Sequence, residues 1–470
     1  MHLKTTTIII LFIGILFSVF IIAYFQYLSV AAPVKANLII DVKKTRGPVA
    51  DRWKALAQGG EEMGVRMLAN VIPQVAALYP RYIRIDHIYD YYEVVSRNNT
   101  GNLKFNWLKL DDTVCDIFRT GAKPFFSLGY MPSVMSEDGS LVSKSKSWEE
   151  WSFLVQKTIE RYSGTNTRLC GQITGFWLTD IYYEVWNEPD LETFGKWSHR
   201  GGEKDYRTLY FYSSLGAQKA TNVNKFLLGG PATTSLYRNW ITQLLDFVKQ
   251  NSLRLDFLSW HHYSKETQNF DSQIQQLNSW LASPQYSPYR LLPKVISEWG
   301  YDSEPNPIAE TNIGAAHTVA SIRNFFRENI ELAFLFEIKD GPSPRWGILS
   351  YRGEEKPRYQ ALKFLNQLQG NELFVEGEGT FVKAMASSLQ KRINLVLVNY
   401  DQSDKNSEVV PLTFSNLEPG QYSMNTVYVD GKTITVKNIS IPSGGSLQRT
   451  IILPANMVVA VELTRESSQD

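Results

Sequence analysis

The stretch YYEVWNEP at residues 182–189 is the part of the sequence that most strongly predicts the fold. It is an apolar strand that delivers Asn187 and Glu188 at its C-terminal end, and the proline that follows cannot extend a ladder because it has no N–H. The stretch KVISEWG at residues 294–300 repeats the pattern and ends in one carboxylate, Glu298. Polar side chains at strand ends are typical of an eight-stranded α/β barrel, whose active face is formed by the C-terminal ends of its strands.

Short apolar runs alternate with stretches of helical character between residues 36 and 368. Such alternation indicates right-handed βαβ units, and eight runs fit a closed (β/α)8 TIM barrel. The expected strands are 38–42, 82–86, 124–128, 182–186, 226–230, 257–260, 295–298 and 332–336, and helices are expected at 108–119, 148–163, 205–221 and 239–250. An open doubly wound sheet is the alternative, which the lack of a glycine-rich phosphate loop before the first helix disfavours.

The pattern changes after residue 368, where short apolar runs recur at intervals of roughly ten residues. Turn signals such as Asp430-Gly431 and Gly444-Gly445 separate these runs. This spacing predicts a C-terminal antiparallel β-sandwich domain over residues 371–466.

Residues 1–30 form a separate segment, within which residues 8–27 carry no charge. A helix of this length, at ~1.5 Å per residue, spans the ~30 Å hydrocarbon core of a bilayer. We therefore expect a transmembrane anchor, with a cleaved signal segment ending near residues 30–32 as the alternative. Either interpretation places the rest of the chain outside the cytoplasm, in the periplasm or the extracellular space. An anchor makes the membrane a partner, whereas a cleaved segment leaves the protein secreted.

The composition narrows the classes of partner. The chain has 48 basic and 47 acidic residues, so no strong field favours nucleic acid, and a neutral ligand suits such a surface.

Cys115 and Cys170 are the two cysteines, which excludes a disulfide framework and a cysteine-rich zinc site. We expect two buried free thiols, with a single bridge as the alternative.

The two glutamates suit the cleavage of a glycosidic bond. Glu188 and Glu298 lie 110 positions apart, which places them on the fourth and seventh expected strands, facing each other across the barrel mouth. The oxocarbenium-like transition state needs one acid for the leaving oxygen and one carboxylate at the anomeric carbon. A carboxyl separation of ~5 to 5.5 Å implies retention through a glycosyl-enzyme, and a larger one implies inversion. Ionised Glu298 and partial desolvation would keep Glu188 protonated until that intermediate forms.

The NEP motif at 187–189 and the EWG motif at 298–300 resemble the acid/base and nucleophile motifs of clan A glycoside hydrolases. With SWHHY at 259–263 and SLGYMP at 127–132, the chain most resembles glycoside hydrolase family 39, which includes β-xylosidases, α-L-iduronidases and bacterial polysaccharide-processing enzymes. The resemblance implies a cofactor-free retaining glycosidase acting on an oligo- or polysaccharide. It makes Glu188 the general acid/base and Glu298 the nucleophile.

The same resemblance assigns roles to neighbouring side chains. It makes Asn187 the donor to the sugar 2-hydroxyl, and it places His261 and Tyr263 beside the nucleophile, where they hold its orientation. Arg84 matches the arginine that keeps the nucleophile ionised. From the residues alone, Arg84 could instead be the buried ion-pair partner of Asp86.

Two positions depart from the family pattern and leave the identity of the sugar open. Asp86 stands where many relatives have histidine, and Phe336 stands where a tryptophan commonly closes the floor of the subsite. Further candidate substrate contacts are Tyr130, Trp299, Trp346 and Asp340. The aromatic candidates could equally serve packing.

No metal-binding set stands out in the sequence. His261 and His262 are adjacent and therefore point to opposite faces of a strand, which argues against a shared ion. His262, and less readily His261, could be a core histidine.

Three other functions fit parts of the sequence. A catalytically silent carbohydrate-binding barrel would use the same surface for recognition only. An accessory protein of membrane polysaccharide assembly would explain the apolar N-terminal segment. Another clan A family with endo activity is the remaining enzymatic alternative.

Overall fold

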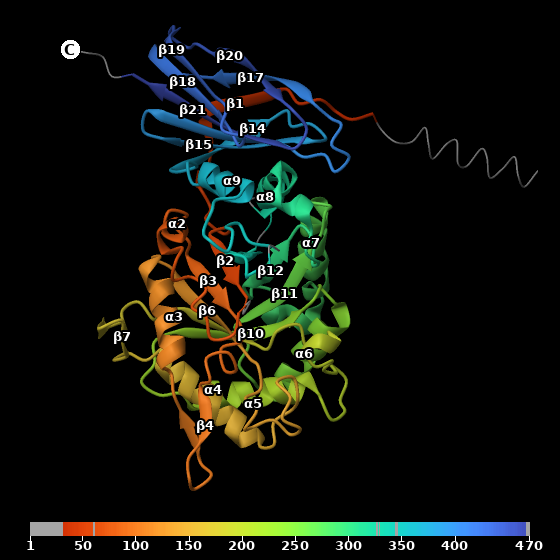
Figure 1. The fold of residues 1–470 in the computed structure, drawn as a ribbon. Coiled ribbons are helices and arrows are strands. Elements are labelled where there is room, and N and C mark those ends of the chain that lie inside the picture. Colours follow the sequence, from red (N-terminus) through yellow and green to blue (C-terminus); the bar gives the residue numbers. More distant parts are fainter. Residues whose placement is uncertain (1–31, 60–61, 326–327, 329, 344–345, 467–470) are drawn as a thin grey trace, which may run out of the picture.

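The structure is a computed structural model that describes residues 32–59, 62–325, 328, 330–343 and 346–466. These residues form a barrel domain and a β-rich domain (Figure 1). The β-rich domain lies at one end of the molecule and packs on two barrel helices, α8 (Asn312–Phe325) and α9 (Pro357–Leu365).

Eight parallel strands close the barrel in the order β2, β3, β6, β9, β10, β11, β12 and β13, and β13 pairs back with β2. The strands are β2 (Ala55–Gln58), β3 (Tyr82–Ile85), β6 (Lys123–Leu128), β9 (Ile181–Val185), β10 (Phe226–Thr233), β11 (Phe257–Tyr263), β12 (Lys294–Gly300) and β13 (Leu332–Phe336). The other helices of the barrel are α2 (Ile72–Ala76), α3 (Leu108–Arg119), α4 (Trp148–Tyr162), α5 (Tyr206–Lys219), α6 (Arg238–Gln250) and α7 (Gln268–Leu281). The predicted closed barrel is confirmed, and so is each predicted helix within one or two residues.

The first predicted barrel strand is wrong. Residues 38–42 belong to β1 (Leu38–Pro48), which pairs with two strands of the β-rich domain, whereas the first barrel strand is β2. Leu38 and Ile40 are buried while Ile39 is exposed, which is the alternation of a one-sided sheet. All four residues of β2 are buried, but ALAQ is too short and too weakly β-forming to stand out in the sequence.

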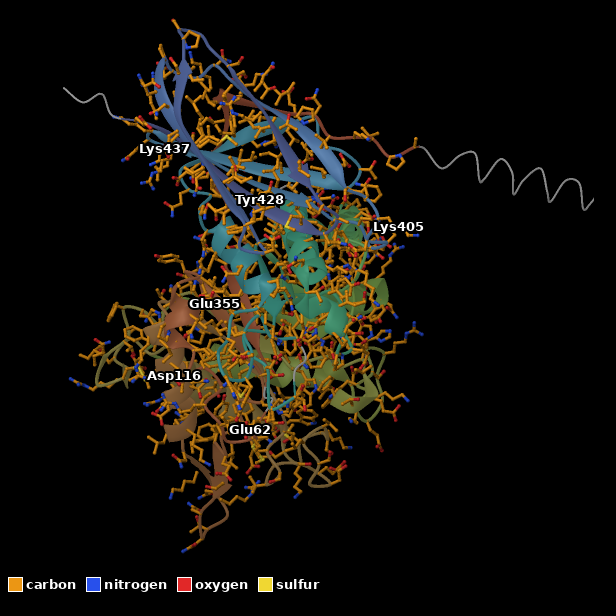
Figure 2. The ribbon with its side chains drawn as sticks, turned by 45° about the horizontal axis from the view of Figure 1, so that its top comes forward. Glu62, Asp116, Glu355, Lys405, Tyr428 and Lys437 are labelled. Carbon is orange, nitrogen blue, oxygen red and sulfur yellow. A yellow bond between two sulfur atoms is a disulfide. The ribbon has the colours of Figure 1, made fainter. Side chains whose placement is uncertain are left out.

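The β-rich domain is a nine-stranded sheet in which β1 lies among strands from the C-terminal part of the chain. Its order is β19-β18-β21-β16-β15-β14-β1-β17-β20, and the pairing is antiparallel except between β1 and β17. The strands are β14 (Asn371–Glu376), β15 (Val382–Leu389), β16 (Arg392–Asn399), β17 (Glu408–Ser415), β18 (Gly420–Tyr428), β19 (Thr433–Ile441), β20 (Leu447–Leu453) and β21 (Met457–Arg465). Figure 2 shows Lys405, Tyr428 and Lys437 on this domain.

Cys115 and Cys170 form a disulfide, so the expectation of two free thiols is wrong. Their Cα atoms lie 5.5 Å apart, within the range that a bridge requires. The bridge joins α3 to the short hairpin of β7 (Arg168–Leu169) and β8 (Gln172–Ile173). In the chain-entropy model, closing a loop across 55 residues stabilises the fold by about 4 kcal/mol.

Across the residues that the structure describes, no helix is both long enough and apolar enough to cross a bilayer. The predicted anchor or signal segment at residues 1–30 lies outside the described residues.

Candidate active site

The N-terminal half of the barrel interior is filled by apolar side chains. Tyr82, Tyr182 and Phe257 belong to one buried cluster with Phe125, and the Phe125 and Tyr182 rings stack at 5.3 Å. Side chains on one face of a strand recur every second residue. Arg84 and Glu184 therefore follow Tyr82 and Tyr182 on the inward face, one layer closer to the barrel mouth.

Arg84 connects this second layer to the strand ends. Its Nε donates to Glu184 Oε2 at 2.8 Å and its Nη1 to Glu298 Oε1 at 2.7 Å. Its Nη2 donates to Asn187 Oδ1 at 2.7 Å, and the Arg84 side chain is only 2% exposed. Bonds from a buried guanidinium to two carboxylates are stronger than bonds between neutral groups. The ion-pair partners of Arg84 are thus Glu184 and Glu298, and Asp86 is not one of them.

Glu298 faces the barrel mouth because strand β12 contains a bulge. Val295 points into the barrel, so strict alternation would turn residue 298 outward. The register between β11 and β12 shifts, so that Trp260 pairs with Ile296 but His261 pairs with Glu298. The extra residue, Ser297, redirects the carboxylate, as bulges near functional sites commonly do. Tyr263 then donates its hydroxyl to Glu298 Oε2 at 2.8 Å.

Glu188 and Asn187 reach the mouth through a turn at the end of β9. Trp186 has φ 71° and Glu188 has φ 42°, a left-handed conformation that is costly for side chains of this size. The turn buries Trp186 and leaves Glu188 at the pocket. The Asn187 amide donates to the Tyr130 hydroxyl at 2.9 Å, and His261 Nδ1 lies 2.9 Å from Glu188 Oε1. Carboxylate oxygens accept, so Nδ1 carries the proton in this contact.

Burial and neighbouring charges compete over the ionisation of this cluster. Burial raises the pKa of Glu298, whereas His261 and Arg84 oppose that rise. Burial disfavours the charged form of His261, but Glu298 and Glu188 together raise the pKa of this ring above its ordinary value. Burial and the Glu298 charge raise the pKa of Tyr263 well above its ordinary value, so Tyr263 stays a neutral donor.

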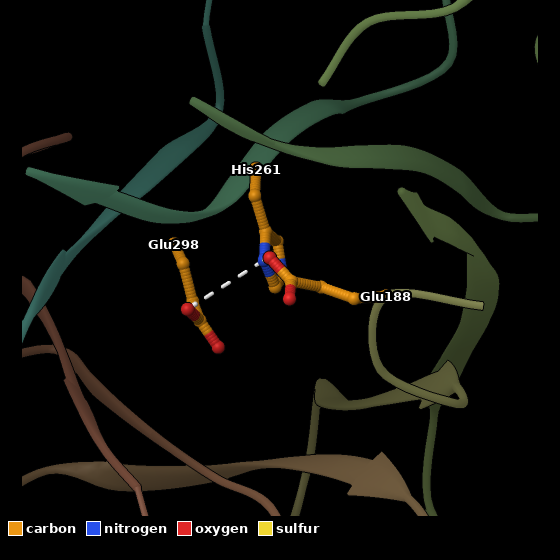
Figure 3. Close-up of side chains that lie close together, drawn as sticks. All are labelled: Glu188, His261 and Glu298. Atoms are coloured by element: carbon orange, nitrogen blue, oxygen red, sulfur yellow. Dashed lines mark hydrogen bonds and ion pairs between the residues drawn. The ribbon is translucent and has the colours of Figure 1, made fainter. Parts of the chain in front are cut away.

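Glu188, His261 and Glu298 meet from three different strand ends (Figure 3). One potential ligand atom from each lies within 4.8 Å of the others, and His261 Nδ1 is 3.5 Å from Glu298 Oε2. Three such atoms could hold a metal ion, a set that the sequence did not single out. Arg84 already places a fixed positive charge on Glu298. The arrangement therefore suits proton transfer and nucleophilic attack better than cation binding.

A pocket of about 690 Å³ opens above the two glutamates. Its described lining includes Asn187, Tyr263 and Trp346, with Phe336 on the same wall. Such a volume accommodates a sugar-sized ligand. The structure thus brings Trp346 to the pocket together with the acid pair.

Three other candidate substrate contacts do not line this pocket. Trp299 is fully buried and packs on Phe270 in the core. Asp340 is 1% exposed, pairs with Lys356 Nζ at 2.5 Å and accepts from a backbone N–H, so it is a structural carboxylate. Tyr130 is also buried and supports Asn187 from behind. For these three, proximity in sequence to a motif or to the eighth strand did not predict a contact with the pocket.

Glu184 belongs to the site, although it was not singled out in the sequence. It is fully buried inside the barrel and pairs with Arg84. A charged residue inside an otherwise apolar strand is the signal that could have identified it, because buried carboxylates need a partner.

The β-rich domain supports the wall of the pocket. The Tyr400 hydroxyl and the Gln402 amide both donate to the backbone carbonyl of Lys265, at 2.7 and 2.9 Å. Lys265 pairs with Asp302 at 2.8 Å, and Trp346 donates its indole N–H to the Asp302 carbonyl at 3.1 Å. The loop after β11 is therefore tied directly to the β-rich domain, and the loop after β12 is tied to it through Lys265.

A barrel with two glutamates at opposing strand ends, beside a polar pocket, has the architecture of a glycosidase. The family model "Glycosyl hydrolases family 39" matches residues 38–431. The chain therefore belongs to glycosyl hydrolase family 39, as the motifs predicted.

Relatives of this chain include two β-xylosidases, each 26% identical to it. The match to the enzyme of Caldicellulosiruptor saccharolyticus runs over 342 residues and covers 66% of each chain. The match to the enzyme of Geobacillus stearothermophilus runs over 391 residues, 75% of this chain and 74% of the relative. Together with the family, these relatives indicate a glycosidase.

A solved structure of a family 39 enzyme from Xanthomonas axonopodis pv. citri superposes with a TM-score of 0.75 at 17% identity. The match covers 92% of this chain and 98% of the other. At this identity the likeness shows the fold, a TIM barrel with a β-rich domain.

His262 gives the fold a measurable pH dependence. Burial lowers the pKa of His262 from 6.5 to about 4, so between these values the unfolded chain binds a proton that the folded chain does not. Stability therefore falls as the pH falls, and between pH 7 and pH 5 this one group costs about 2 kcal/mol. His262→Phe keeps an aromatic ring against Phe270. Between pH 7 and pH 5, the melting temperature of this variant should fall by less than that of wild type. Equal losses in the two proteins would contradict this reading.

Proposed function

We propose that the protein is a retaining glycosidase that cleaves an oligo- or polysaccharide by double displacement, with Glu298 as nucleophile and Glu188 as general acid/base. The observation that carries this proposal is the closeness of the two carboxylates, whose nearest ligand-type atoms lie within 4.8 Å. Retaining enzymes hold their carboxyl groups ~5 to 5.5 Å apart, whereas inverting enzymes leave room for a water.

In the first step Glu298 forms a bond to the anomeric carbon while the glycosidic C–O bond breaks. The leaving oxygen takes the proton of Glu188. Arg84 and Tyr263 each donate to a different oxygen of Glu298, which keeps its carboxylate ionised and oriented for attack. Asn187 is held by Arg84 and Tyr130 beside the pocket, where it is placed to donate to the sugar 2-hydroxyl.

In the second step Glu188 acts as a base. Glu188, now ionised, takes a proton from water, and the water oxygen displaces Glu298 from the anomeric carbon. His261 Nδ1 lies 2.9 Å from Glu188 Oε1 and 3.5 Å from Glu298 Oε2, so one ring N–H is placed to stabilise whichever carboxylate is ionised. The anomeric configuration is therefore retained.

The kinetics of two variants test these roles, with aryl β-xylosides as probes because both relatives are β-xylosidases. Glu298→Ala should lower kcat by at least about 10³-fold for every leaving group, because no covalent intermediate forms. Glu188→Ala should slow substrates with poor leaving groups by about 10²- to 10⁴-fold and activated ones far less. Glu192→Gln, on the exposed rim of the strand-end loop, is the control and should match wild type.

Equal losses on good and poor leaving groups would refute the acid role of Glu188. A silent carbohydrate-binding barrel or an accessory protein of polysaccharide assembly predicts no turnover by wild type on any glycoside. Deleting residues 1–30 should leave turnover intact if that segment only anchors or exports the enzyme.

We also propose that the barrel lies outside the cytoplasm, anchored or exported through residues 1–30. The Cys115–Cys170 bridge supports this location, because disulfides persist mainly in oxidising compartments. Protease added to intact cells that express the full chain should remove a C-terminal tag. A tag that is cleaved only after lysis would place the enzyme inside.

A further inference from the structure

Asp86 is a carboxylate in the pocket that the proposed mechanism does not use. It follows strand β3 directly, two positions after Arg84, and so continues the inward face of that strand toward the barrel mouth. It lines the same pocket as Glu188 and Glu298. Its negative charge raises the pKa of Glu298, so it lies close enough to the nucleophile to act on it.

Asp86 has no hydrogen-bond partner for Oδ1 among the described residues, although that oxygen is buried. Arg84, the nearest cation along the strand, directs its three nitrogens to Glu184, Glu298 and Asn187. A buried acceptor that stays unpaired costs ~1 to 3 kcal/mol, and more for a charged group. Asp86 therefore lines the ligand pocket with a carboxylate that the described residues do not fully satisfy.

The other aspartates near the site have protein partners. Asp90 Oδ2 lies 2.6 Å from His87 Nδ1, and its Oδ1 accepts from the Tyr130 N–H. Asp340 pairs with Lys356. Unlike these two, Asp86 combines a buried oxygen that has no partner with a place on the pocket wall.

The charge of the pocket restricts which ligand can donate hydrogen bonds to the Asp86 carboxylate. Its described lining carries four carboxylates, Asp86, Glu188, Glu298 and Glu304, and neither lysine nor arginine. A sugar carboxylate would meet like charge beside Asp86, and no lysine or arginine among these lining residues would offset it. Sugar hydroxyls, in contrast, are neutral donors that a carboxylate oxygen binds strongly.

We propose that Asp86 is a specificity-determining residue that accepts hydroxyl protons from an uncharged sugar ring held between Glu188 and Glu298, and that it selects against uronic acids. This inference rests on the proposed glycosidase function and names the class of sugar in its pocket. Asp86 binds the ring and takes no part in bond cleavage.

The experiment compares wild type with Asp86→Asn and Asp86→Leu on aryl xylosides, and on matched aryl glucosides and glucuronides of both anomeric configurations. Wild type should turn over the uncharged sugars with a kcat/KM at least about 100-fold above that for the uronic acids. Asp86→Leu should lose about 100-fold in kcat/KM on the uncharged sugar, and Asp86→Asn, which keeps one acceptor oxygen, about 10-fold. Asp430→Asn removes the same charge from an exposed turn of the β-rich domain and should change nothing.

Aryl xylosides that lack one hydroxyl identify the contact itself. Removing the hydroxyl that Asp86 accepts should slow wild type strongly but leave Asp86→Leu almost unchanged, because the interaction is already lost. Equal responses of both proteins at every hydroxyl position would overturn the inference, as would a wild type that prefers glucuronides. The melting temperature of Asp86→Leu shows whether this variant is folded. If it is not, the response of Asp86→Asn to the loss of each hydroxyl is compared with that of wild type instead.

The two proposals fail in different ways. If Glu298→Ala keeps its activity, the double-displacement mechanism is ruled out, whatever the role of Asp86. An Asp86→Asn variant with wild-type kcat/KM on all sugars removes the selectivity role, while the dependence on Glu298 stays intact.

Discussion

The active site depends on one buried ion cluster. Arg84 donates hydrogen bonds to Glu184, Glu298 and Asn187 at 2.7 to 2.8 Å. It lies inside a barrel whose N-terminal half is filled by packed aromatic and aliphatic side chains. Burial alone favours a protonated Glu298, and Glu188 close by adds to that tendency. His261 and the Arg84 guanidinium oppose both effects, although the pKa of Glu298 stays above its ordinary value. Their positive charge favours the ionised form of Glu298, the form able to attack, next to a second carboxyl group. Removing one partner of such a buried pair is strongly destabilising.

Two departures from regular strand geometry bring the acid pair together. The bulge at Ser297 turns Glu298 inward, and the left-handed residues Trp186 and Glu188 end strand β9 at the barrel mouth. The bulge turns inward a nucleophile that strict alternation from Val295 would place outward. The left-handed turn does the same for Asn187, which alternation from Tyr182 and Glu184 would point away from the pocket. The β-rich domain contributes from outside the barrel, because Tyr400 ties down a loop of the pocket wall.

The sequence could predict the features that depend on local pattern and on motif. Apolar runs and the family motifs predicted seven of the eight barrel strands, the position of Glu188 and Glu298 at strand ends, and the place of His261 and Tyr263 beside the nucleophile. The hydrogen-bond contact of His261 with Glu188 was not predicted. Features that depend on tertiary contacts could not be predicted from the sequence. The apolar run that contains Leu38 looked like a barrel strand, because pairing partners more than 300 residues away leave no local trace.

The same limit explains the other corrections. The Cys115–Cys170 bridge depends on a Cα separation that sequence spacing cannot reveal. Asp340 follows the eighth strand, as a substrate contact would, but the ion pair with Lys356 that makes it structural is a tertiary contact. Trp299 follows the nucleophile in sequence but points outward to the helices, as alternation after Glu298 requires.

Trapping the glycosyl-enzyme tests the central claim most directly. An activated 2-fluoro sugar slows the second step more than the first, so the enzyme should accumulate in covalent form, and mass mapping of the digested protein should place one sugar on the peptide that contains Glu298. A label on any other carboxylate, or a product of inverted configuration formed without a label, would contradict the account.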